Sequence, residues 1–124
     1  TRSEFIEIFR TVLKKKNYRI DFLSKIDKII KEENQKSIIN GLLLFQSWME
    51  DAFKLSLNPE NRDIINTDKI EVLQSFTKNF QGYDFLKAFS KIENSLILIK
   101  KNVNIQIILV NLFLSLRQIL YKSN

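Results

Sequence analysis

Side chains that could carry acid–base or metal chemistry are few in this sequence. It contains neither His nor Cys, so the imidazole base, the thiolate nucleophile and the nitrogen and sulfur ligands of zinc are all missing. Carboxylates remain, and adjacent pairs occur at Glu32-Glu33 and Glu50-Asp51. No other catalytic group lies at a spacing that would bring it to either pair, so we interpret both as exposed helical positions. We predict no catalytic site and no metal site, and an enzyme that uses only carboxylates and lysines is the alternative.

Patterns for binding small ligands are missing as well. The chain has two glycines, and they do not form a glycine-rich phosphate loop. The stretch from Asn58 to Asp68 carries several oxygen-bearing side chains, but not at the alternating positions of a calcium-binding loop. We therefore expect an ordinary loop there, and neither a cofactor nor a small-molecule substrate for this chain.

Positive charge is the second chemical feature of the sequence. The net charge is +6 and the pI is about 9.6, which is compatible with an acidic or nucleic-acid partner. The lysines are scattered apart from two clusters, Lys14-Lys15-Lys16 and Lys100-Lys101. Because charge alone is a weak indication of function, we interpret both clusters as solvated surface. A basic helical nucleic-acid-binding domain that uses them is the alternative.

The elements that must position these residues are helices. Only two Gly and one Pro occur, and apolar residues recur at helical spacing along almost the whole chain. We predict an all-α fold, a single compact bundle of about six helices formed by residues 1–124. The chain starts without Met and with a helical pattern that Ser3 can cap, so we expect it to be the C-terminal piece of a longer protein.

Capping residues predict several helix boundaries. Asn34 or Ser37 can start a long third helix. Asn58-Pro59 ends that helix, because proline cannot continue the helical hydrogen-bond ladder. Asp68 and Glu71 have the spacing of a capping box, which predicts the start of a fourth helix.

The clearest local pattern is a helical hairpin near the C-terminus. Asn102 can adopt the left-handed conformation that ends one helix. Asn104 can start the next helix, because its side-chain oxygen accepts a hydrogen bond from an unpaired backbone N–H. The stretch 105–120 that follows contains one charge, Arg117. Polar residues interrupt its apolar run well short of the roughly 20 residues that span a membrane, so we predict no membrane association.

The last helix is apolar on nearly all of its sides. One small domain can cover one face of such a helix and part of another, so we predict that the rest packs against another subunit. The residues expected in this interface lie at helical spacing towards the end of the helix: Phe113, Leu116, Arg117 and Leu120.

These features together resemble the C-terminal collar domain of bacterial clamp-loader subunits, most closely that of the delta-prime subunit of DNA polymerase III. The resemblance is carried by Trp48 with Glu50-Asp51, by the helical stretch 84–101, and by Asn102-Val103-Asn104 followed by the apolar stretch 105–116. It extends in weaker form to the earlier part of the chain. The sequence departs from the family in having Ile-Gln-Ile-Ile after the second Asn, where an arginine and leucines are usual.

The resemblance implies a non-catalytic assembly domain. In that family the collars of several subunits pack side by side in a ring, and the ring loads the sliding clamp during DNA replication. An ATPase-type module would precede residue 1, other clamp-loader subunits would be the partners, DNA would be contacted only through the assembled loader, and the location would be the cytoplasm. The collar of the gamma/tau ATPase subunit is the alternative within the family.

Overall fold

The chain folds as a bundle of helices in the computed structural model, which describes residues 2–101 and 104–121. Within those residues there are six α-helices, one short 3-10 helix and no strand. The elements are α1 (Arg2–Val12), α2 (Arg19–Glu32), α3 (Gln35–Leu57), η1 (Thr67–Lys69), α4 (Ile70–Asn79), α5 (Phe85–Lys100) and α6 (Ile105–Tyr121). The predicted all-α bundle is confirmed.

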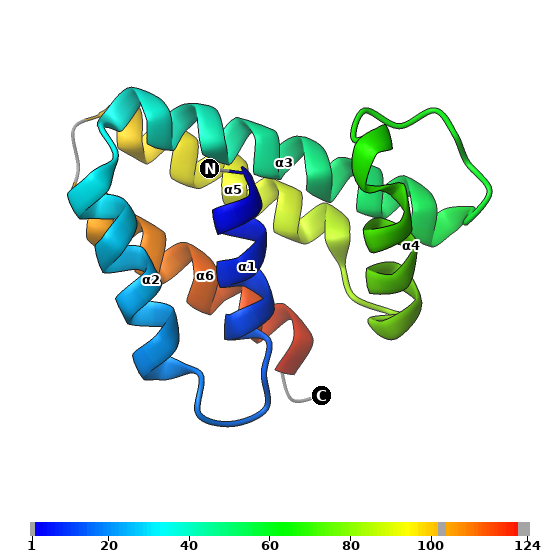
Figure 1. Cartoon of the computed structure of the whole chain (residues 1–124), viewed down its shortest axis with the longest axis horizontal. Helices are drawn as coiled ribbons and strands as arrows, with labels where there is room; N and C mark the ends of the chain where they lie inside the picture. The colour runs from blue at the N-terminus through cyan, green and yellow to red at the C-terminus, as the bar shows by residue number, and fades with distance from the viewer. Residues whose placement is uncertain (1, 102–103, 122–124) are drawn as a thin grey trace.

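Two long helices and a hairpin organise the bundle (Figure 1). Helices α3 and α5 pack along one another, and α5 and α6 form the predicted antiparallel pair. Helix α1 contacts α2, α3 and α6, while α4 packs on α3 and forms a separate corner of the molecule. Helix α6 packs against α1, α2 and α5, and its Phe113 ring also contacts Phe45 of α3.

Aromatic rings from α1, α3 and α6 form the centre of the core. Phe5 packs against Phe45 and Phe113, with ring centroids 6.3 Å and 6.0 Å away. Phe9 meets Trp48 edge to face at 6.2 Å. All five side chains have no exposed surface, and buried rings of this size dominate the hydrophobic stabilisation of a small domain. This cluster fixes the three helices relative to one another.

Several predicted helix boundaries are confirmed by capping contacts. Asn34 precedes α3 and its side chain accepts a hydrogen bond from the Ser37 backbone N–H at 2.8 Å. Helix α3 ends at Leu57, and its C-cap Asn58 stands directly before the proline. Between α4 and α5 the chain turns at Gly82, whose φ of +85° is strained for residues with a side chain.

Two predicted caps are wrong. Helix α1 already includes Arg2, so Ser3 lies inside the helix instead of capping it. The proposed capping box fails because α4 begins only at Ile70, after the 3-10 turn, and has no side-chain cap. The Asp68 carboxylate instead accepts a hydrogen bond from Arg2 at 2.7 Å, and this contact lowers the pKa of Asp68. A contact between distant segments has replaced the local one.

Candidate functional site

Of the two asparagines in the hairpin turn between α5 and α6, one lies within the described residues. Asn104 caps α6 as predicted, because its side-chain oxygen accepts a hydrogen bond from the Ile107 backbone N–H at 3.2 Å. Asn102 lies outside the described residues, so its role in ending α5 stays a prediction.

Phe113 and Leu116 lie in the core of the domain, which corrects their assignment to a subunit interface. Both side chains are 0% exposed. The Phe113 ring packs against Phe5, Phe45 and Phe22. Because α1 and α2 cover this face of α6, a partner has no access to either residue in this fold.

Arg117, the single charge of α6, closes the end of α1. Its guanidinium donates hydrogen bonds to the backbone carbonyls of Val12, at 2.7 Å, and of Lys14 and Lys15. Carbonyls at the C-terminal end of a helix have no partner within the helix, and a cation is favoured at that end. In this structure Arg117 therefore acts as an intramolecular clasp between α6 and the turn that follows α1.

Two tyrosines hold the Arg117 side chain from either side. The guanidinium carbon lies 3.8 Å from the ring centre of Tyr18 and 4.2 Å from that of Tyr121. The Tyr121 hydroxyl donates to the Leu13 carbonyl at 2.6 Å. Planar guanidinium groups stack well on aromatic faces, so this layered arrangement orders the last turn of α6. Leu120, the remaining predicted interface residue, is half-buried.

Exposed apolar surface lies at the other end of the hairpin, next to its turn. Ile107 on α6 is 56% exposed, and Leu98 on the adjacent part of α5 is 43% exposed. Both line a shallow groove between the two helices, which runs past Asn111 to Ser115. This surface is a better candidate for a subunit contact than the predicted residues, because its side chains are accessible.

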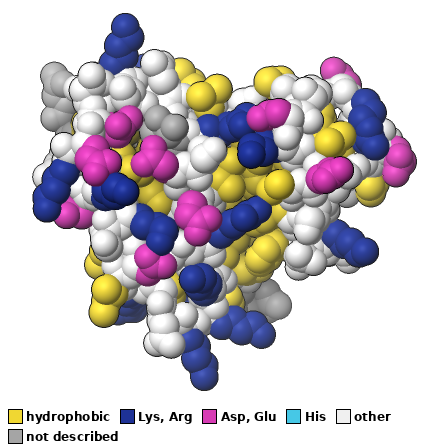
Figure 2. Space-filling model, in the orientation of Figure 1, with side chains coloured by type: hydrophobic (Ala, Val, Ile, Leu, Met, Phe, Trp, Pro, Cys, Tyr) yellow, Lys and Arg dark blue, Asp and Glu magenta, His cyan; other side chains and the backbone are white. Residues whose placement is uncertain are grey.

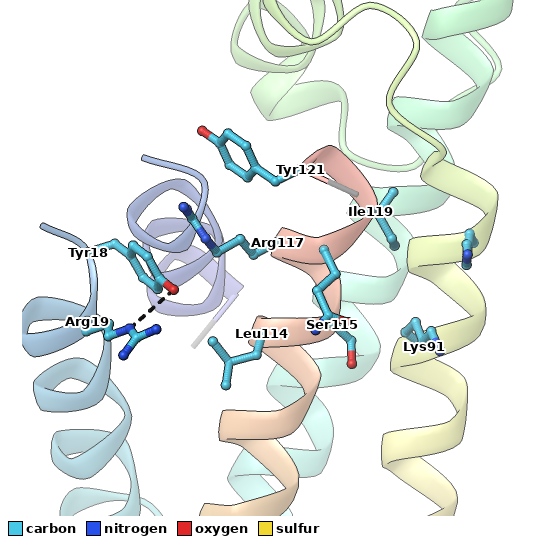
Figure 3. Close-up of a pocket in the computed structure, with 10 residues that line it drawn as sticks. Tyr18, Arg19, Lys91, Leu114, Ser115, Arg117, Ile119 and Tyr121 are labelled. Atoms are coloured by element: carbon cyan, nitrogen blue, oxygen red, sulfur yellow. Dashed lines mark hydrogen bonds between the residues drawn. The ribbon is translucent and has the colours of Figure 1, made fainter. Parts of the chain in front are cut away.

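A second, larger groove crosses α6 near its C-terminal end (Figure 3). Its volume is about 680 Å³ and ten side chains line it. Arg19 lies on one side, at the start of α2, and Lys91 lies on the other side, on α5. The lining is Tyr18, Arg19, Lys87, Lys91, Leu114, Ser115, Arg117, Gln118, Ile119 and Tyr121. Four of these side chains are cationic and none is a carboxylate.

The two lysine clusters seen in the sequence do not form one patch. Lys14, Lys15 and Lys16 are exposed next to Arg117. The cluster that begins at Lys100 lies at the opposite end of the α5–α6 hairpin (Figure 1). Lys87 and Lys91, which join the basic groove, were missed, although two lysines four residues apart on one helix are a visible signal of a shared face.

The carboxylate pair on α3 has an unexpected structural role. Glu50 is half-buried, but Asp51 is fully buried, so its predicted exposure is wrong. The Asp51 carboxylate accepts hydrogen bonds from the backbone N–H groups of Ile65, at 3.0 Å, and Asn66, at 2.7 Å, and from the Asn66 side chain. The Asn66 oxygen in turn accepts from Arg2 at 2.7 Å. This network clasps the loop after α3 to α1, and no spacing in the sequence signals it.

In the described part of the chain, no three Asp or Glu side chains are grouped as metal ligands would be. Among the described helices, none combines the length and the hydrophobicity that a membrane crossing needs. Figure 2 shows acidic and basic side chains interspersed over α1 and α2, with an apolar hollow between this part and α4.

By its fold and surface the domain is an all-α helical bundle with an accessible apolar groove and a basic groove on its last two helices. A family model described as "DNA polymerase III, delta subunit, C terminal" matches residues 1–118. The chain therefore belongs to this family, and is the C-terminal domain of a clamp-loader subunit of DNA polymerase III. No curated protein and no solved structure matches the chain.

Proposed function

We propose that this domain is a non-catalytic assembly module, which holds its clamp-loader subunit to the neighbouring subunits. The observation that supports the proposal most is the exposed apolar surface around Ile107 and Leu98, on the hairpin that the family resemblance places in the collar ring. Contiguous apolar surface of this kind is typical of protein interfaces. A stable complex buries about 800 Å² on each partner, so neighbouring side chains of α5 and α6 would contribute as well.

The test uses Ile107→Asp in a co-purification with the other subunits of the same clamp loader. Ile107 is in the first turn of α6, where a carboxylate is favoured by the helix dipole, so the variant should fold. Ile20→Asp is the matched control, because Ile20 is 87% exposed and lies in the first turn of α2, away from this groove. We expect Ile107→Asp to lose the complex and Ile20→Asp to keep it. Retention of a salt-resistant complex by Ile107→Asp would show that the interface lies elsewhere.

We propose that the subunit is delta-prime rather than the delta subunit that the family description names, and the collar of gamma/tau is the alternative. The proposal is supported by the Trp48 and Asn104 regions of the sequence, which look most like delta-prime. The two differ in their upstream ATPase module, so a longer chain that includes it would be assayed for ATP hydrolysis. No hydrolysis is expected for delta-prime, whereas an active ATPase would assign the chain to gamma/tau. For such a subunit the location would be the cytoplasm.

A further inference from the structure

The basic groove on α6 is a second candidate site, next to the apolar groove proposed for assembly, with which it shares Lys91 and Ser115. Arg19 and Lys91 lie on either side of it, on the two helices that flank α6 (Figure 3), and Lys87 of α5 lines it as well. The carboxylates nearest in the sequence have other partners: Asp21 pairs with Lys25, Asp84 caps α5 by accepting from the Lys87 backbone N–H at 2.9 Å, and Glu93 accepts from the Gln46 side chain at 2.6 Å. The groove therefore presents positive charge that its own lining does not neutralise.

Two of these cations stand where the helices themselves disfavour them. Arg19 is the first residue of α2, and Lys87 is in the first turn of α5. The N-terminal end of a helix carries partial positive charge, so a cation there is repelled and an anion is attracted. An anion bound in this groove would offset both repulsions at once.

Aromatic faces lie at one end of the same groove. Tyr18 and Tyr121 sandwich the Arg117 guanidinium at 3.8 Å and 4.2 Å, and Tyr121 is 39% exposed. Their rings are therefore held in place before any ligand arrives. Cations that follow a groove, interleaved with aromatic rings on which bases stack, are the pattern of sites for single-stranded nucleic acid.

We propose that this groove binds a single strand of nucleic acid, with phosphates at Arg19, Lys87 and Lys91 and a base on the exposed ring of Tyr121. The exposed lysines Lys14 to Lys16 flank Arg117 and extend the positive surface beyond the groove. An acidic peptide would use the cations but would leave the rings without a role, so the lining favours nucleic acid. Leu98 and Ile107, the exposed apolar side chains proposed for assembly, line only the other groove, so Ile107→Asp tests assembly without changing a residue of the basic groove.

The test measures binding of fluorescently labelled single-stranded oligothymidylate to the 124-residue chain by anisotropy over a range of salt concentrations. The variant is Lys87→Gln with Lys91→Gln. The matched control is Lys100→Gln with Lys101→Gln, which removes the same charge at the other end of α5. We expect about tenfold weaker binding for the groove variant at moderate salt, and a salt slope reduced by about 1.4, since each lost phosphate contact on a single strand contributes about 0.7. The control should bind as the unchanged chain does.

Three results would overturn the proposal. The first is no binding at low salt. The second is an equal loss in both double variants, which would indicate general charge attraction. The third is displacement of the oligonucleotide by poly-glutamate at matched charge, which would assign the groove to an acidic peptide. Thermal melting of each variant, and Arg19→Gln as an independent groove variant, separate loss of the site from loss of the fold.

Discussion

Replacing Arg117 with Met should destabilise the domain itself, whether or not partners are present. The change keeps an unbranched apolar chain but removes the three hydrogen bonds to the carbonyls of Val12, Lys14 and Lys15 and the stacking on two tyrosine rings. Hydrogen bonds from a charged group contribute about 1.5–3 kcal/mol each when buried, and an exposed cation–π contact contributes about 0.5–1 kcal/mol.

The site is only partly buried and its contacts are not independent, so the loss on substitution is smaller than the sum of these hydrogen-bond and cation–π contributions. We expect the free energy of unfolding to fall by about 2–3 kcal/mol. For a domain of this size that corresponds to a Tm about 10 °C lower. Thermal unfolding followed by far-ultraviolet circular dichroism measures it, with Arg62→Met as the control, because Arg62 lies exposed in the loop after α3. A Tm for Arg117→Met within about 2 °C of the unchanged chain would contradict the stabilising role of Arg117. The predicted subunit interface would then be its remaining proposed role.

Three further predictions follow from buried groups. Phe113→Ala should cost about 3–5 kcal/mol through the cavity it leaves, so urea unfolding should show a folding defect before any assembly defect is seen. Asp51→Asn places an amide donor against the N–H groups of Asn66, and should cost about 2–3 kcal/mol while hydrogen exchange of the Asn66 amide accelerates. Tyr83 donates its buried hydroxyl to the Leu116 carbonyl at 2.8 Å, and burial raises its pKa above the ordinary 10.0. Stability is then intact below pH 10.0 and falls as the pH rises above it, because ionisation is easier in the unfolded chain; urea unfolding of Tyr83→Phe should lack this alkaline fall.

Much of the helical framework could be predicted from the sequence because its determinants are local. The cap at Asn34, the stop at Asn58 and the cap at Asn104 each depend on atoms within three or four residues along the chain. The apolar periodicity likewise indicated the all-α class. The family resemblance rested on the same segments, and the family model confirms it at the level of a clamp-loader subunit.

The direction in which each side chain faces depends on how the helices pack. A helix that is apolar on nearly all sides gives no indication of which side its own domain covers, so Phe113 and Leu116 were placed on the wrong surface. The sequence does not indicate the contacts of Arg117 either, because its carbonyl partners are more than 100 residues away in the chain.

The basic groove and the Asp51 network depend in the same way on long-range packing. Arg19 and Lys87 belong to different helices, and they line one groove only because both helices pack beside α6. Local chemistry determined where the helices begin and end, because capping and periodicity act over a single turn. Their packing determined which side chains form the core, the clasp and the accessible surfaces, because each of these is made by residues that are distant in sequence.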